Sequence, residues 1–236
     1  MAKRKAASYM TSGERIAGVI LFLIYLVVLP FVLTPFFNLC EDVVGAPISQ
    51  ALRSGIYYCV LFVVCILVFR KFLGRTTENL GNNLGPACQA MLLGLVGLYG
   101  LNELIYRLSS LVIKNITNMN DVTISAQVDD APKLTFIIIV LVAPFVEEVL
   151  FRGLVFGNLK GKSLNVAYVL SCVLFALSHV WQFAVDAPTV VHFVVMLQYL
   201  APGFVLAWSY DRSGTLWTPI ALHAVFNALA LWTRFD

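Results

Sequence analysis

Three charged side chains lie in an otherwise apolar stretch of the sequence. Glu147, Glu148 and Arg152 fall within Leu134–Leu159, a run long enough to cross a membrane as a helix. A charge inside hydrocarbon costs about 2.5–3.5 kcal/mol even on the mildest scales, so such residues usually mark a functional site. On a helix, Arg152 lies one turn after Glu148 and pairs with it, while Glu147 points to another face. We therefore expect one neutralised carboxylate, at Glu148, and one available for chemistry, at Glu147.

Two later apolar runs carry polar side chains at the same helical spacing. Phe175 and His179 are four residues apart, and so are His223 and Asn227. A carboxylate with an imidazole can activate water, and imidazole or amide N–H groups can stabilise an oxyanion. Alternatively, Glu147, His179 and His223 could ligate a divalent metal such as zinc. Because no serine or cysteine in these runs lies beside an obvious base, a covalent nucleophile is not predicted.

Composition places these residues in an integral membrane protein. Of the 236 residues, 60% are hydrophobic and only 12% are charged, and the mean hydropathy is +0.85. Soluble proteins are nearer to about half apolar and a quarter charged. The five cysteines have no disulfide or metal-ligand spacing, and no basic patch interleaved with aromatic residues predicts nucleic-acid binding.

Seven apolar runs of near-spanning length predict about seven transmembrane helices. The runs are Ile16–Phe37, Gly55–Phe69, Ala90–Ile113, Leu134–Leu159, Leu164–Phe183, Thr189–Tyr210 and Thr215–Thr233. Basic residues gather in alternate loops, so the positive-inside rule predicts a cytoplasmic N-terminus. The polar segment Lys114–Lys133 then lies outside, as a flexible cap or a short interfacial helix. Glu103 and Arg107, one helical turn apart, are expected to neutralise each other.

Taken in order, the three polar motifs resemble one known family. Glu-Glu-x-x-x-Arg at 147–152, Phe-x-x-x-His at 175–179 and His-x-x-x-Asn at 223–227 are similar to the motifs of the CPBP family. This family comprises type II CAAX prenyl endopeptidases and bacteriocin-processing (Abi) intramembrane proteases. The resemblance divides the chain into N-terminal membrane helices with an external loop, 1–133, and a catalytic membrane domain, 134–236. It implies an all-α polytopic transmembrane bundle with a four-helix catalytic core in the C-terminal half.

The resemblance also implies roles for the motif residues. Glu147 and His179 are expected to activate the attacking water. His223 and Asn227 are expected to form the oxyanion hole. The expected supporting side chains are Glu148, Arg152 and Phe175. The site is expected in a cavity open to the cytoplasmic side. No obligate metal is expected. The alternative is metal ligation by Glu147, His179 and His223.

The expected function is that of an intramembrane endopeptidase in the bacterial plasma membrane. Its expected partners are membrane lipids and a peptide or protein substrate near the inner leaflet, prenylated or not, and nucleic acid is not among them. A non-catalytic membrane immunity or regulatory protein is the first alternative, because the polar cluster could serve structure alone. A small transporter ranks last, since no repeats or paired broken helices are visible. The oligomeric state does not follow from the sequence.

Overall fold

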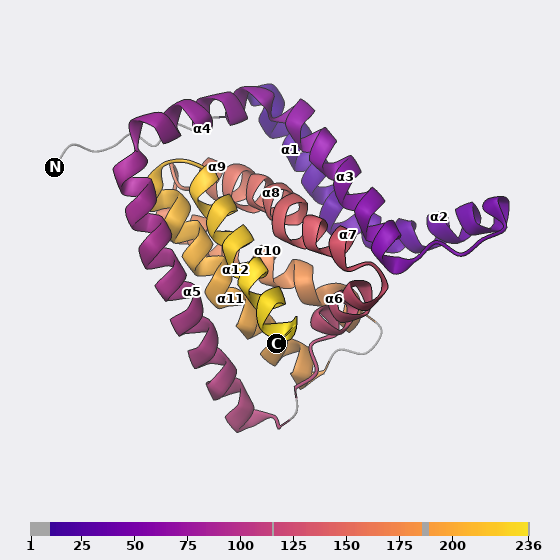
Figure 1. Ribbon diagram of the computed structural model, residues 1–236. Coiled ribbons are helices and arrows are strands. Elements are labelled where there is room, and N and C mark those ends of the chain that lie inside the picture. Colours follow the sequence, from indigo (N-terminus) through magenta and orange to yellow (C-terminus); the bar gives the residue numbers. More distant parts are fainter. Residues whose placement is uncertain (1–9, 115, 186–188, 236) are drawn as a thin grey trace.

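The computed structural model describes residues 10–114, 116–185 and 189–235, and within these ranges the chain is an all-helical bundle without strands (Figure 1). The elements in chain order are α1 Ser12–Leu23, the π-helix η1 Ile24–Val28, α2 Leu29–Val44, α3 Gln50–Val68, α4 Arg70–Asn82, α5 Leu84–Val112, α6 Met119–Asp130, α7 Pro132–Ile137, the π-helix η2 Ile138–Val142, α8 Ala143–Glu148, the π-helix η3 Val149–Phe156, α9 Gly157–Leu159, α10 Leu164–Ala184, α11 Val190–Ser213 and α12 Trp217–Phe235.

Six continuous helical segments of the described chain are long and apolar enough to cross a membrane. They are Ser12–Val44, Gln50–Val68, Leu84–Val112, Pro132–Leu159, Leu164–Ala184 and Val190–Ser213. The seventh predicted run forms α12, whose apolar stretch Trp217–Trp232 is shorter than the others. Large apolar side chains are exposed along α2, α3 and α5, as expected for helices that face lipid. The predicted polytopic helical bundle is confirmed, with six spanning helices and one shorter apolar helix.

Local sequence signals explain where several helices begin and end. Thr11 and Glu14 form a capping box at the start of α1, and the Ser163 hydroxyl caps the first turn of α10. Gly214 ends α11 at φ 70°, a left-handed conformation that glycine adopts without steric cost. The buried Glu14 carboxylate also accepts a hydrogen bond from the Phe72 backbone N–H at 2.8 Å, which joins the start of α1 to α4.

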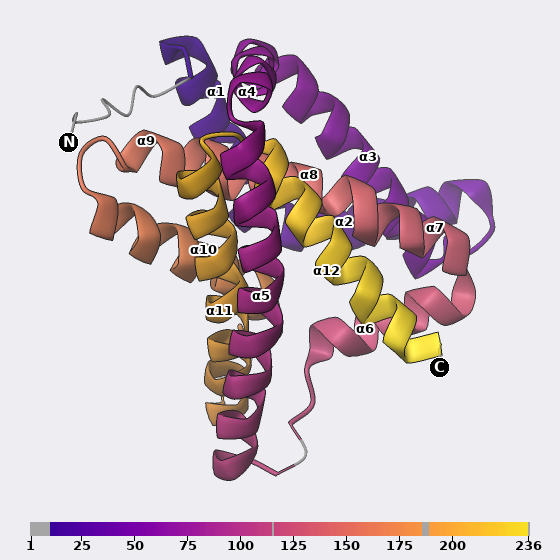
Figure 2. The same cartoon turned by 60° about the vertical axis from the view of Figure 1, so that its left-hand side comes forward.

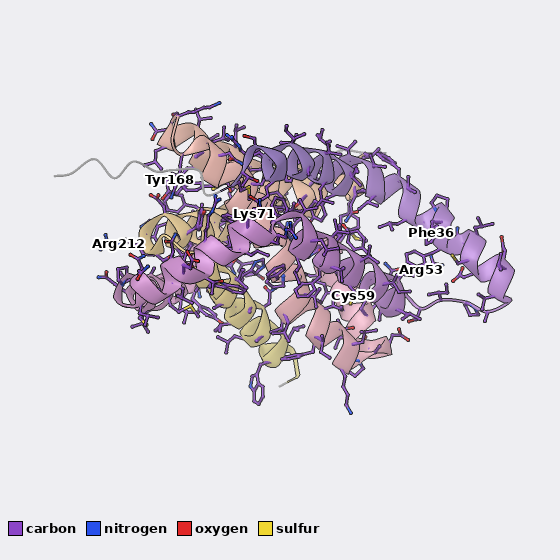
Figure 3. The ribbon with its side chains drawn as sticks, turned by 90° about the horizontal axis from the view of Figure 1, so that it is seen from above. Phe36, Arg53, Cys59, Lys71, Tyr168 and Arg212 are labelled. Atoms are coloured by element: carbon purple, nitrogen blue, oxygen red, sulfur yellow. The ribbon has the colours of Figure 1, made fainter. Side chains whose placement is uncertain are left out.

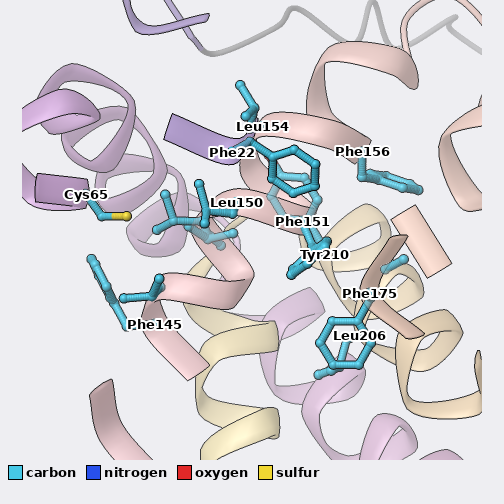
Figure 4. Close-up of a cluster of buried hydrophobic side chains, with 14 of the residues drawn as sticks. Phe22, Cys65, Phe145, Leu150, Phe151, Leu154, Phe156, Phe175, Leu206 and Tyr210 are labelled. Atoms are coloured by element: carbon cyan, nitrogen blue, oxygen red, sulfur yellow. The ribbon is translucent and has the colours of Figure 1, made fainter. Parts of the chain in front are cut away.

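The segment Pro132–Leu159 is the central element of the bundle. It is the most buried of the six spanning segments, and it passes from α7 to α9 through the two π-helices η2 and η3. Phe151 on η3 makes edge-on aromatic contacts with Phe22 and Phe175, each with ring centroids 5.4 Å apart (Figure 4). The helix that carries the charged motif therefore packs between α1 and α10 within the main hydrophobic cluster of the core.

The bundle has two distinct ends, which we name the α4 end and the α6 end (Figures 1 and 2). At the α4 end, α4 is hydrogen-bonded through Thr76 to Thr215 in the α11–α12 link. At the opposite end, the polar segment that follows α5 forms α6, so the helical alternative for this segment is the one observed. The hydroxyl of Thr135 on α7 donates to the carbonyl of Gln127 on α6 at 2.8 Å.

Helices from before and after residue 133 pack together throughout the bundle. Helix α3 packs against α7, η2 and α8, and α5 packs against α11 and α12. By contrast, α2 extends away from the other helices as an arm (Figure 1). The division into units 1–133 and 134–236 stays a prediction.

Candidate active site

A buried ion pair holds the second glutamate of the motif. Glu148 Oε1 accepts hydrogen bonds from Arg152 Nη1 and from His223 Nδ1, both at 2.9 Å. Arg152 Nη2 donates to the Gly203 carbonyl on α11 at 3.0 Å. Glu148 and Arg152 are 0% exposed, so water does not compete for these bonds. The predicted pairing of Glu148 with Arg152 is confirmed, and the structure adds a bond from each partner to another helix.

An aromatic ring lies against the charged groups of the site. The guanidinium carbon of Arg152 is 4.3 Å from the centroid of the Phe175 ring, a cation–π distance. The same ring has its centroid 4.7 Å from that of His179 and 5.9 Å from that of His223. Phe175 therefore touches three of the polar motif residues, which fits the supporting position expected for it.

The first glutamate of the motif is not paired with the arginine. Glu147 is 5% exposed, and its Oε1 accepts a hydrogen bond from the Tyr58 hydroxyl on α3 at 3.3 Å. Its Oε2 lies 3.9 Å from His179 Nε2, and this buried oxygen has no hydrogen-bond partner in the described structure. Because this oxygen faces the imidazole and its residue lines the cavity described below, Glu147 is the motif carboxylate placed to act as a base.

The imidazole of His179 is held in one orientation by its surroundings. Its Nδ1 is 2.8 Å from the Phe175 carbonyl, which can only accept, so Nδ1 carries a proton. The ring also stacks on Tyr199 of α11, with centroids 4.3 Å apart and planes inclined by 24°. In the neutral imidazole, Nε2 is then the basic nitrogen, and it faces Glu147.

The last motif residues lie on α12, on the same side as the carboxylates. His223 Nδ1 contacts Glu148, which leaves its Nε2 directed elsewhere. The side-chain amide of Asn227 donates to the Ile139 carbonyl in η2 at 2.9 Å. Because the amide nitrogen carries two hydrogens, this bond fixes the side chain and leaves one N–H available.

These side chains meet at the inner end of one large cavity. The cavity has a volume of about 920 Å³, and its lining includes Glu147, His179, His223 and Asn227. Its lining continues through the α6-end parts of α3, α5 and α11 to α6 itself. All four residues predicted to be catalytic are thus brought to one cavity, while their catalytic roles stay predictions. The exposed Glu103–Arg107 ion pair, with Nη2 and Oε1 2.6 Å apart, lies outside this lining.

The alternative in which three side chains hold a metal finds no support in the arrangement of donors. Glu148 occupies the Nδ1 of His223, so only its Nε2 could ligate an ion together with Glu147 and His179. Across the described residues, no group of three His, Cys, Asp or Glu side chains is placed to hold an ion. Metal dependence stays a prediction to be tested on the purified protein.

Three contributors to the site were missed by motif reasoning. Tyr58 bonds Glu147 from a segment that carries no motif, and Tyr199 stacks on His179 from the helix between the second and third motifs. Gly203 contributes only a backbone carbonyl. No spacing in the sequence signals such partners, because each contacts the motif across the bundle.

Comparisons with known proteins agree with the motifs. Residues 130–229 match the family model of the type II CAAX prenyl endopeptidase, Rce1-like. "Putative membrane peptidase YdiL" of Bacillus subtilis is 31% identical over 107 residues, which are 45% of this chain and 39% of that protein. "UPF0177 protein in abiGi 5'region" of Lactococcus lactis subsp. cremoris is 35% identical over 98 residues, 42% of this chain and 37% of that protein.

The chain thus spans about two fifths of the length of these curated relatives. No solved structure matches it significantly. The matched segment contains all three motifs and the helices that carry them. The segment that carries the three motifs is therefore similar to the type II CAAX prenyl endopeptidase, Rce1-like family over residues 130–229.

Proposed function

We propose that the protein is an intramembrane endopeptidase that hydrolyses a peptide bond with water activated by Glu147 and His179. One observation carries the proposal: the unpartnered Glu147 Oε2 lies 3.9 Å from the basic nitrogen of His179, at the buried end of a cavity of about 920 Å³. Two proton acceptors that face each other can both bind an attacking water, and one of them can take its proton. The match of residues 130–229 to a peptidase family supports the same reaction.

In the proposed reaction, Glu147 takes a proton from water as the water oxygen attacks the carbonyl carbon of the scissile bond. Negative charge develops on the carbonyl oxygen, where His223 and the second amide N–H of Asn227 can donate hydrogen bonds. As the tetrahedral intermediate collapses, the carbon–nitrogen bond breaks and the leaving amine takes the proton from Glu147. His179 orients the water by accepting a hydrogen bond at Nε2, because its Nδ1 proton is fixed by the Phe175 carbonyl.

The contact between His223 and Glu148 explains how an imidazole could serve as an oxyanion donor. Nδ1 already donates to the Glu148 carboxylate, so Nε2 carries a proton only when the ring is an imidazolium. The same carboxylate oxygen, Glu148 Oε1, contacts both His223 and Arg152 and so holds the imidazole beside the guanidinium. Glu148 and Arg152 thus act on the reaction through His223 and do not touch the substrate.

Replacement of the proposed base tests this function. Glu147→Gln keeps the size of the side chain and removes its capacity to take a proton, so we expect it to abolish cleavage while the protein still accumulates in the membrane. Peptides from cells with wild-type protein and with Glu147→Gln, compared by mass spectrometry, provide the measurement. Glu103→Gln is the matched control, because Glu103 is an exposed glutamate outside the cavity.

The alternatives predict other outcomes for the same cells. Identical peptide profiles in wild type and Glu147→Gln would refute the protease and leave the cluster a structural role, as in a non-catalytic immunity or regulatory protein. A profile that changes to the same extent in Glu103→Gln would show that the effect does not come from the site.

A further inference from the structure

The cavity occupies only one half of the bundle. Its buried end is formed by Glu147 and His223, and its lining reaches the surface at Gln50, Tyr106 and Asp121, which are exposed residues on or beside the α6 end. Among the described residues, none from α4, from the α9–α10 link or from the α11–α12 link lines it. The route from Glu147 to the surface therefore leads towards the α6 end.

Charge distinguishes the two ends of the molecule. The described basic residues at or beside the α4 end are Arg15, Arg70, Lys71, Arg75, Lys160, Lys162 and Arg212. Figure 3, viewed onto this end, shows Lys71 and Arg212 on it. The α6 end, together with the last turn of α2 and the first turn of α3, carries the acidic residues Glu41, Asp42, Asp121, Asp129 and Asp130, with the basic residues Arg53, Lys114 and Lys133. By the positive-inside rule, the α4 end faces the cytoplasm and the α6 end faces away from it.

Together these observations conflict with a cavity that opens to the cytoplasm. A cytoplasmic α4 end puts the surface mouth of the cavity on the opposite side of the membrane, because the lining continues to α6 and not to α4. The expectations of a cytoplasmic N-terminus and a cytoplasmic cavity cannot both hold, since α1 begins at the α4 end, joined there to α4 by Glu14.

We propose that the peptide cleaved at Glu147 enters from the non-cytoplasmic side, so that the substrate is an exported peptide or protein segment of neutral or basic character. This inference rests on the proposed function. The charge preference follows from the lining: Glu147 and Asp121 contribute carboxylates, and no lysine or arginine among the described residues lines the cavity. A substrate segment with negative charge would be repelled by these carboxylates and would find no lysine or arginine there to offset the repulsion.

Cysteine labelling in spheroplasts tests the orientation without any substrate. Ala126→Cys on α6 and Lys162→Cys in the α9–α10 link are both exposed positions outside the cavity lining. Each is introduced after Cys40, Cys59 and Cys88 have been changed to serine; Cys65 and Cys172 are buried, and this background is the control for labelling. A membrane-impermeant maleimide should label Ala126→Cys in intact spheroplasts, and Lys162→Cys only after permeabilisation. The reverse order overturns the proposal.

The identity of the cleaved peptides tests the substrate class. Peptides that depend on Glu147 should come from exported proteins or from segments outside the cytoplasmic membrane, and should carry no net negative charge beside the cut. Cytoplasmic or acidic peptides would overturn this inference while leaving the protease intact. Conversely, if Glu147→Gln changes no peptide, the proposed function fails, and the labelling result still decides which way the cavity faces.

Discussion

At the scale of single residues, one carboxylate oxygen organises much of the site. Glu148 Oε1 accepts from Arg152 and from His223, and Arg152 in turn bonds the Gly203 carbonyl and lies over the Phe175 ring. The helices that carry the three motifs are thereby joined through the Arg152 guanidinium and the Glu148 carboxylate. Removing one member of such a buried charged pair strongly destabilises the protein, because the other charge is left without compensation.

Arg152→Met tests how much this buried pair contributes to the stability of the protein. The change leaves the buried Glu148 carboxylate without its guanidinium partner and with only the hydrogen bond from His223, so we expect a loss of about 3–5 kcal/mol in stability. The melting temperature in detergent and the amount of protein in the membrane should both fall. Arg107→Met breaks the exposed Glu103–Arg107 pair and should cost less than about 1 kcal/mol. Equal melting temperatures for Arg152→Met and wild type would refute the structural role of the pair.

Tyr58→Phe tests whether the Tyr58 hydroxyl positions the proposed base, Glu147, while leaving the fold intact. The Tyr58 hydroxyl bonds Glu147 Oε1 at 3.3 Å, and losing one such bond is worth about 0.5–1.5 kcal/mol, or about a 2- to 10-fold fall in cleavage rate. The protein should still accumulate normally, since the ring and its packing are kept. Tyr99→Phe, an exposed tyrosine on α5, is the matched control and should leave the rate unchanged. An unchanged rate in Tyr58→Phe would show that the hydroxyl does not position the base.

At the scale of helices, the close contact between α10 and α11 places His179 and Tyr199 ring against ring. A Cβ at Gly203 would lie 3.3 Å from the Cys172 Cα and 3.5 Å from its carbonyl oxygen, which are backbone atoms that cannot turn aside. The approach of the two helices therefore depends on the missing side chain at this position. The same close approach brings the Gly203 carbonyl within reach of Arg152.

Gly203→Val should force α10 and α11 apart. We expect a destabilisation of about 1–3 kcal/mol, the usual cost of overpacking, together with reduced cleavage as His179 and Arg152 lose their α11 partners. Gly100→Val is the matched control, because a Cβ at Gly100 meets no atom within 4 Å. Thermal unfolding of both variants in detergent provides the measurement, and a Gly203→Val protein as stable as Gly100→Val would contradict the close-contact model.

The helical elements also show how far sequence reasoning reaches. Hydrophobic run length located every spanning helix, and i,i+4 spacing placed Arg152 on Glu148, because both depend only on local geometry. The π-helices η2 and η3, which flank Glu147 and Glu148, were not predicted. A π-turn is stabilised by packing around it and has no strong local sequence signal, so it emerges only when the neighbouring helices are in place.

At the scale of the whole molecule, the site draws on more of the chain than the family segment alone. Residues 130–229 supply the motifs, but Tyr58 and the outer lining at Gln50 and Tyr106 come from helices before them. The motif pattern could predict which side chains meet, whereas the shape and direction of the cavity depend on how α3, α5 and α6 surround them. Those contacts join residues far apart in sequence, so no spacing rule reveals them.

The position of α12 has a consequence for the biosynthesis of the protein. His223 and Asn227 lie on this helix, which follows every other site element in chain order and has the shortest apolar stretch among the membrane-type helices described. Until α12 has left the ribosome and docked, Glu148 lacks its imidazole partner and the cavity lacks one wall. A nascent chain can thus insert its earlier helices into the membrane while its cluster of charges is still incomplete. Completion of the site coincides with the docking of α12.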